Sequence, residues 1–194
     1  IMGLSQTTAP TVEPVTLTEA KLHCRVDISA DDDLLTALIV AAREQVENFT
    51  RRQLVTATYT LTLPAFPPGV GVLRLPRPLL ASVTSISYVD TGGDTQTMDT
   101  DDYVVQTDTL PGQVSLAYGC SWPTTRAQEN AVTVVYTAGY GDTAAAVPAA
   151  VKAAMLLIIG HLYDHREAVV MGATPTDLPM GVSALLWPYR HLEA

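Results

Sequence analysis

Apolar residues in the segment Asp32–Thr50 recur every three or four positions, which is the period of an amphipathic α-helix. Glu44, Glu47 and Asn48 fall on the opposite, polar face of this predicted helix. The carboxylates of Asp31–Asp33 suit the positive N-terminal end of a helix dipole. The apolar stripe comprises Leu34, Leu35, Leu38, Ile39, Ala42, Val46 and Phe49.

A shorter helix, about Leu17–Arg25, is predicted before the long one by its capping residues. Thr16 and Glu19 form the T-x-x-E pattern, in which the two side chains satisfy each other's backbone N–H groups. Arg51 and Arg52 follow the long helix and suit its negative C-terminal end. Two helices are therefore expected near the N-terminus.

The pattern then changes to a period of two. In Leu54–Leu63, Val, Ala, Tyr and Leu alternate with four threonines, which predicts a half-buried strand. Turn sequences at Thr91–Asp94 and Leu110–Gly112 separate further short strands, and the spacing favours an antiparallel sheet or small barrel. These further strands are expected at Val72–Leu75, Val83–Asp90, Gln96–Met98, Tyr103–Gln106, Val114–Ala117 and Ala131–Ala138.

A second long helix is predicted after Pro148, whose missing N–H is tolerated in the first helical turn. Its middle, Ala153–Gly160, carries no polar side chain on any face. Such a helix is typically buried on most sides, in a core or between subunits. The run is bounded by Lys152 and His161 and is too short for a membrane span, which needs about 20 residues. No membrane contact is expected.

These elements predict an α+β fold with a helical core and an inserted, antiparallel β-rich segment. The core would comprise two N-terminal helices, a long C-terminal helix and a short terminal helix at about Val182–Trp187. We expect a flexible arm at residues 1–14 and a single domain at residues 15–190. Its parts are the N-terminal helices (15–53), the β-rich segment (54–138), the long helix with its preceding turn (139–167) and a docking tail (168–194).

Composition limits the possible partners. The net charge is −9, and only 16% of the residues are charged. Proteins that grip nucleic acid need clustered lysine and arginine, so specific DNA binding is not expected. Cys24 and Cys120 are the only cysteines in the sequence, which favours free thiols.

Candidate chemistry is confined to His161, Asp164 and His165. The two histidines stand four apart on one predicted helix face, which is the spacing of helical zinc sites. Leu162 occupies the position where the H-E-x-x-H motif has glutamate. The alternative is a structural helix end at which these histidines and Arg166 complement the dipole. No other catalytic motif is present, so we expect neither catalysis nor a cofactor.

Read in order, the chain resembles the head–tail connector proteins of tailed bacteriophages, also called adaptor or head-completion proteins. The likeness extends from Pro14 to Arg190 and combines capping, core and turn positions. The matching segments are PVTLTEAKLHCRVD (Pro14–Asp27), DDDLLTALIVAAREQVENFTRRQL (Asp31–Leu54), LPRPLLASVTSISYVD (Leu75–Asp90), VTVVYTAGYGD (Val132–Asp142), VPAAVKAAMLLIIGHLYDHREA (Val147–Ala168) and GVSALLWPYR (Gly181–Arg190).

This resemblance implies a structural virion protein that forms a ring of twelve copies beneath the portal, at the DNA exit vertex. A stopper or tail protein would attach to the ring, and packaged DNA would pass through it without specific binding. The protein would be made in the cytoplasm of the bacterial host. Short members of the family are mostly helical, so their contacts do not transfer to the β-rich segment. The alternatives are a stopper or tail terminator, or a small metal-dependent hydrolase at the histidine pair.

Contacts with partners are expected from the C-terminal segment, because an apolar group there follows a polar, Pro- and Gly-bearing loop. Tryptophan, tyrosine and arginine are common hot-spot residues in interfaces. The alternative is that the terminal helix folds back on its own domain. The candidate interface residues are Leu178, Met180, Leu185, Leu186, Trp187, Tyr189 and Arg190.

Overall fold

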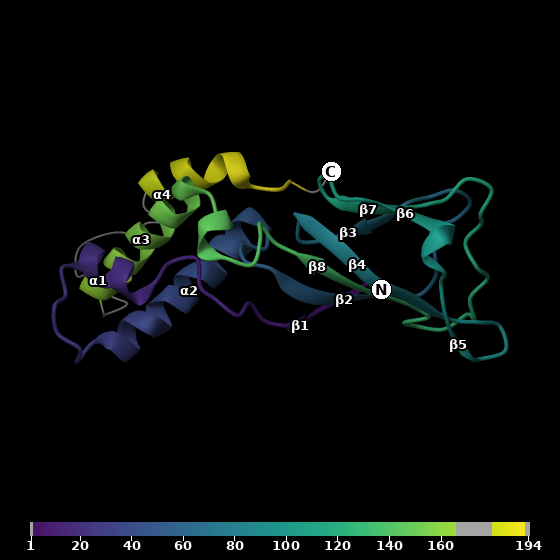
Figure 1. Cartoon of the computed structure of the whole chain (residues 1–194), viewed down its shortest axis with the longest axis horizontal. Helices are drawn as coiled ribbons and strands as arrows, with labels where there is room; N and C mark the ends of the chain where they lie inside the picture. The colour runs from purple at the N-terminus through teal and green to yellow at the C-terminus, as the bar shows by residue number, and fades with distance from the viewer. Residues whose placement is uncertain (1, 166–179, 193–194) are drawn as a thin grey trace, which may run out of the picture. The chain divides into compact units, whose positions relative to one another are not determined.

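The computed structural model describes residues 2–165 and 180–192. The chain divides into two compact units, each built from separate stretches of sequence. We call residues 1–10 and 56–140 the β unit, and residues 11–55 and 141–194 the helical unit. Figure 1 labels the elements of both. The α+β class and the antiparallel sheets are as predicted.

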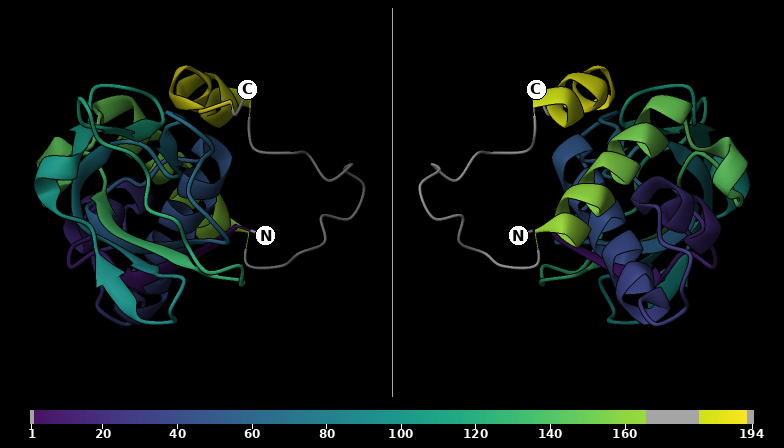
Figure 2. Two further views of the ribbon diagram at one scale, coloured as in Figure 1. Left: turned by 90° about the vertical axis from the view of Figure 1, so that its right-hand side faces the viewer. Right: turned by 90° about the vertical axis from the view of Figure 1, so that its left-hand side faces the viewer.

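The helical unit contains α1 (Leu17–Cys24), α2 (Asp32–Thr50), α3 (Ala149–Asp164) and α4 (Met180–Leu186). Two 3₁₀ turns accompany them, η2 (Ala144–Ala146) and η3 (Trp187–Tyr189). α3 packs against α1, α2 and α4 (Figure 2). The bounds of α2 agree with its apolar stripe, because that stripe supplies the face that α2 buries. The fully buried side chains between these helices include Leu35, Ala42, Val46, Val151, Ala154, Met155, Ile159, Val182 and Leu186.

The N-terminus of α1 is capped as its sequence predicts. The Thr16 hydroxyl accepts a hydrogen bond from the backbone N–H of Glu19, and the Glu19 carboxylate accepts one from the N–H of Thr16. The other oxygen of the carboxylate lies 3.0 Å from Lys152 Nζ on α3. The capping glutamate therefore also links α1 to α3.

The β unit contains two antiparallel sheets. The larger sheet has the strand order β1-β2-β8-β4-β5, and the smaller has the order β3-β7-β6. Each predicted strand is present, with bounds shifted by a few residues at most, and a short 3₁₀ turn, η1 (Thr100–Asp102), precedes β6. The strands are β1 (Gly3–Thr8), β2 (Ala57–Leu63), β3 (Leu73–Leu75), β4 (Leu80–Val89), β5 (Thr95–Thr97), β6 (Tyr103–Gln106), β7 (Gly112–Leu116) and β8 (Val132–Ala138).

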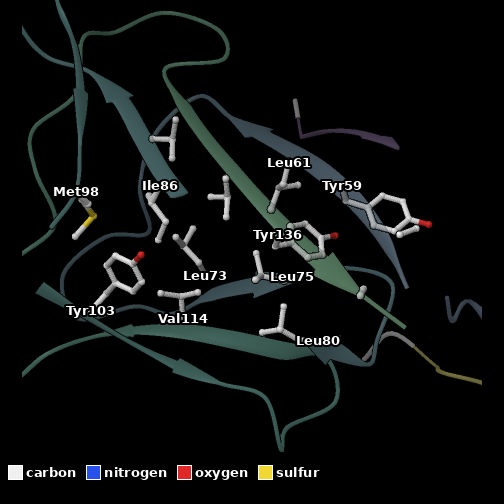
Figure 3. Packing of buried hydrophobic residues seen from close by; sticks show 14 residues of the cluster. Tyr59, Leu61, Leu73, Leu75, Leu80, Ile86, Met98, Tyr103, Val114 and Tyr136 are labelled. Atoms are coloured by element: carbon white, nitrogen blue, oxygen red, sulfur yellow. The ribbon is translucent and has the colours of Figure 1, made fainter. Parts of the chain in front are cut away.

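The core of the β unit lies between the inward faces of its two sheets (Figure 3). Tyr59 on β2 is paired directly with Tyr136 on β8, and their rings stack with centroids 5.8 Å apart. The Tyr136 hydroxyl donates a 2.8 Å hydrogen bond to the Pro76 carbonyl, which satisfies a largely buried phenol. Leu73 and Leu75 of the smaller sheet point into the same cluster. The period-two pattern therefore specified which faces are buried.

The N-terminal arm differs from the prediction. Gly3–Thr8 is not a flexible arm but forms β1, which pairs antiparallel with β2 at the edge of the larger sheet. Most of β1 is exposed, so backbone hydrogen bonds and not burial hold it in place. The hydroxyls of Ser5 and Thr7 add bonds to carbonyl oxygens of β2. A strand that buries almost nothing has no hydrophobic alternation, and the sequence pattern could not reveal it.

Among residues 2–165 and 180–192, no helix has the length and apolar character needed to cross a bilayer. Cys24 and Cys120 are both unpaired thiols, as expected.

Candidate protein-contact site at the end of α2

The C-terminal end of α2 is held by a buried polar network. Glu47 Oε2 lies 3.0 Å from Arg43 Nη1, and its other oxygen accepts hydrogen bonds from Gln53 Nε2 at 2.7 Å and the Leu54 N–H at 3.1 Å. Arg43 also binds Glu13 at 2.8 Å. Glu47 is only 6% exposed, so its predicted place on the solvent face of α2 is wrong. Its buried charge is tolerated because both oxygens have partners.

The terminal helix α4 packs on its own unit. Val182 and Leu186 are fully buried, and α4 contacts α3 and α2. Leu185 is partly buried. Met180 begins α4, although the sequence predicted it as the last residue of a loop at Ala168–Met180; its side chain, the whole of Leu178 and the rest of that loop lie outside the described residues. Of the candidate interface residues, Leu186 therefore serves the fold of its own unit.

Two hydrogen bonds attach the segment after α4 to the end of α2. The N–H of His191 donates to the Thr50 carbonyl at 2.8 Å, and Arg52 Nε donates to the Tyr189 carbonyl. The carbonyl of Thr50 is one of the last in α2, which have no partner within the helix. These bonds fix the backbone from Tyr189 to His191 and thereby orient Arg190.

Arg190 lies beside two aromatic rings. Its guanidinium carbon is 5.3 Å from the centroid of the Phe49 ring and 5.4 Å from that of Trp187. Both distances suit cation–π attraction. Trp187 is nevertheless 60% exposed and Tyr189 is partly buried. The aromatic residues therefore hold the arginine and still present apolar surface to solvent.

The Nε atom of Arg190 is buried and has no hydrogen-bond partner among the described residues. Its guanidinium likewise forms no ion pair with a described carboxylate. Arg51 and Arg52 stand at the same helix end, so three of the eleven lysines and arginines of an acidic chain gather there. The site combines an exposed tryptophan, a held arginine and local positive charge, which are typical features of a protein-contact surface.

The predicted metal candidates are close together but do not form a ligand set. The rings of His161 and His165 are 4.7 Å apart, and His165 Nδ1 lies 3.0 Å from the carbonyl oxygen of His161. Asp164 lies near Cys24, where burial and then this carboxylate raise the pKa of the Cys24 thiol. Within the described parts of the chain, no group of three metal-binding side chains occurs. The observed geometry is that of a helix end.

The apolar helix α3 is buried on one side only in this chain. Val151, Ala154, Met155, Ile158 and Ile159 face the unit's interior. Leu157 is 41% exposed and Ala153 is exposed, four residues apart on the same side of the helix. Among residues 2–165 and 180–192, an apolar strip of α3 formed by Ala153 and Leu157 is therefore left exposed.

The sequence predicted Trp187, Tyr189 and Arg190 as contact residues, which stays a prediction, but did not indicate the residues that position them. Phe49 was predicted only as part of the stripe of α2, and Arg52 only as a charge at its end. No periodic pattern relates the end of α2 to residues 187–190, which are far away in sequence. The only sequence signal for this site was the presence of residue types that are common in interface hot spots.

Comparison with known proteins gives a consistent identification. Residues 14–113 match the family described as phage gp6-like head-tail connector protein. No curated protein matches the sequence. The structure is similar to a chain in "Neck of empty GTA particle computed with C6 symmetry", with 25% identity, a TM-score of 0.80, and coverage of 99% of this chain and 97% of that chain.

Two further structures are similar. One is "Virion of native gene transfer agent (GTA) particle", with 25% identity, a TM-score of 0.80, and coverage of 98% of this chain and 96% of that chain. The other is "Neck of native GTA particle computed with C12 symmetry", at 23% identity, a TM-score of 0.74, and coverage of 99% and 97%. The family match includes α1, α2, strands β2 to β6 and the first two residues of β7, and spans more than half of the chain. The resemblance seen in the sequence is thus confirmed, and the chain belongs to the phage gp6-like head–tail connector family.

Proposed function

We propose that this connector protein forms a ring of twelve copies beneath the portal, at the vertex where DNA leaves the head. The ring links the packaged head to the stopper or tail and lines the DNA channel. The observation that carries this proposal is the likeness, at a TM-score of 0.80, to a chain of a particle neck over 99% of this chain. The likeness includes both the helical unit and the β unit, whereas the family match ends at residue 113.

A ring of twelve is compatible with the rotational symmetry of that neck. The neck of the empty particle was computed with C6 symmetry, and twelve copies satisfy a sixfold axis with two copies in each repeat. In this proposal, the four helices form the connector-type core, and residues 56–140 are an insertion into it.

The acidic character of the chain suits a channel through which DNA must slide. A net charge of −9 gives little attraction for phosphates, and DNA would pass without specific binding. The proposed location is the head–tail interface of the virion, after synthesis in the bacterial cytoplasm. A ring whose inner surface proved rich in lysine and arginine would contradict this part of the proposal.

Two surfaces of the helical unit are proposed to contact other neck proteins. The exposed apolar strip of α3, Ala153 and Leu157, would pack against a second copy in the ring, because an exposed apolar helix face otherwise costs free energy in water. The C-terminal docking tail, residues 168–194, would contact a portal subunit or another copy. In the described part of this tail, the contact residues are Leu185, Trp187, Tyr189 and Arg190.

Electron microscopy of the protein mixed with its cognate portal tests the proposal, with the portal alone as control. A new symmetric layer with twelve copies under the narrow end of the portal is the expected result. A portal that gains no layer, although it binds a known partner, would contradict the adaptor function and favour a stopper or tail terminator.

A further inference from the structure

We propose that the Arg190 guanidinium is a receptor for a carboxylate of a second copy of this chain. The proposal rests on the ring function above and names the contact chemistry between neighbouring subunits. It starts from the Arg190 guanidinium, which belongs to a partly exposed residue, lies beside the rings of Phe49 and Trp187, and pairs with no carboxylate of the described residues. A positive charge that is held in place and has no carboxylate beside it is suited to bind one from another molecule.

The local geometry restrains Arg190 in a position from which it can bind a carboxylate. The hydrogen bonds from His191 to Thr50 and from Arg52 to Tyr189 fix the backbone on both sides of it. The rings of Phe49 and Trp187 lie within cation–π distance of its guanidinium carbon. An arginine restrained in this way loses little side-chain entropy on binding, and its planar fork matches the two oxygens of a carboxylate.

The charge of the chain favours a second copy as the source of that carboxylate. The sequence has 20 acidic residues against 11 lysines and arginines, so each copy offers surplus carboxylates. In a closed ring, one surface of each subunit meets a different surface of the next, and a positive site therefore needs a negative counterpart elsewhere on the same chain. A positive cluster at one helix end of an otherwise acidic protein fits that requirement.

A phosphate of DNA is the competing ligand, and the surroundings of Arg190 disfavour it. Phe49 and Trp187 lie beside the guanidinium, and Trp187, at 60% exposure, supplies apolar surface there. Apolar contacts around an arginine are typical of protein interfaces, whereas phosphate sites are more polar and more densely basic.

The first test compares self-association of the full-length R190Q and R74Q variants by sedimentation velocity over a range of concentrations. Arg74 is exposed on β3, so both changes remove one surface charge and alter the net charge equally. R190Q is expected to weaken association about tenfold or more, because a partner carboxylate is left unpaired, and R74Q to follow the wild type. Circular dichroism of R190Q establishes that it is folded. Equal association of R190Q and wild type would overturn the proposal.

The second test identifies the partner group directly. R190K places an amine where a zero-length carbodiimide reagent couples it to a carboxylate in contact. A mixture of ¹⁴N- and ¹⁵N-labelled protein separates crosslinks between copies from those within one copy by mass. The reaction is run on the free protein and on protein bound to its portal, with R74K as the control.

A mixed-isotope crosslink from position 190 to an aspartate or glutamate is the expected result. Crosslinks only within one copy, only to the portal, or none in either sample would overturn the inference. Loss of double-stranded DNA binding in R190Q, with self-association unchanged, would assign the site to phosphate instead. If the protein forms a layer on the portal but gives no mixed-isotope crosslink, only the Arg190 contact is rejected. If no layer forms on the portal, the proposed ring function is rejected.

Discussion

Glu47 on α2 accepts a 2.7 Å hydrogen bond from the Gln53 side chain, three residues beyond the end of the helix. The same carboxylate binds Arg43 and the N–H of Leu54. One buried charge thus fixes both the last turn of α2 and the direction in which the chain leaves it. The family match does not reveal this role, and the sequence pattern placed Glu47 on the solvent face.

Glu47→Ala is expected to destabilise the helical unit by about 2–4 kcal/mol, because the buried Gln53 amide and Leu54 N–H lose their acceptor and Arg43 keeps only Glu13 as a close carboxylate partner. Glu44→Ala is the matched control, since the Glu44 side chain is 63% exposed and lies 3.9 Å from Arg43. That change should cost below about 0.5 kcal/mol. Urea unfolding followed by far-ultraviolet circular dichroism measures both values. Equal losses of unfolding free energy in the two variants would show that the buried network around Glu47 does not stabilise the unit more than an exposed glutamate does.

Glu19 predicts a specific acid dependence. Hydrogen bonds from the Thr16 N–H and then from Lys152 lower the pKa of Glu19 from 4.5 to about 2. A carboxylate whose pKa is lower in the folded state contributes stability that is complete above the unfolded pKa. This contribution should therefore be intact above pH 4.5 and disappear as the pH falls toward about 2.

Melting temperatures of wild type and Glu19→Gln over this pH range provide the measurement. The difference between the two proteins is expected to be constant near neutral pH and to shrink between pH 4.5 and about 2. Lys152→Met should reduce the difference at neutral pH. A gap that persists unchanged at pH 2 would contradict the assigned pKa.

β1 should behave as an ordered edge strand. An added Cβ at Gly3 would lie 2.6 Å from the Thr62 hydroxyl oxygen, so Gly3→Ala must displace either β1 or the Thr62 side chain, whose hydroxyl donates a hydrogen bond to the Gly3 carbonyl. Hydrogen exchange of the β1 amides is expected to accelerate in this variant. Removing the obstructing hydroxyl with Thr62→Ala in the same chain should restore slow exchange, and Thr62→Ala alone serves as the control. Exchange in the wild type as fast as in an unstructured peptide would contradict the pairing.

Leu157→Asp tests the exposed apolar strip of α3. Because Leu157 is 41% exposed in the single chain, the folded monomer should tolerate an aspartate there. A subunit interface that buries position 157 should be disrupted by the same aspartate, because its charge would be buried without a partner. We expect normal circular dichroism and loss of the layer on the portal in electron microscopy. Val70→Asp, at a site 86% exposed in the β unit, is the control and should leave the layer intact. Normal rings with Leu157→Asp would place this strip outside the interface.

The elements that the sequence predicted well are those that bury a face. The stripe of α2 includes Leu35, Ile39 and Val46, all of which are buried, and the helix bounds followed from it. The alternation in β2 marked Tyr59 and Leu61 in the same way. For these elements, local pattern and tertiary structure depend on the same hydrophobic contacts.

The features that could not be predicted depend on pairs of residues distant in sequence. β1 is held by backbone bonds to β2, and nothing in the residues Gly3–Thr8 specifies that partner. Glu47 is buried because Arg43 and Gln53 surround it, although glutamate at that helical position is ordinarily solvated. Arg190 was predicted as a contact residue from its residue type alone, and its placement beside Phe49 could be seen only in the folded chain.

The division of the β unit into two stretches of sequence also bears on how this chain and its relatives differ in length. β1 lies before the helical unit, whereas every other strand lies within residues 56–140. A relative without the strands of residues 56–140 would have no sheet edge on which residues 3–8 could pair. The N-terminal strand and residues 56–140 should therefore be gained or lost together, as two distant segments that form one evolutionary unit.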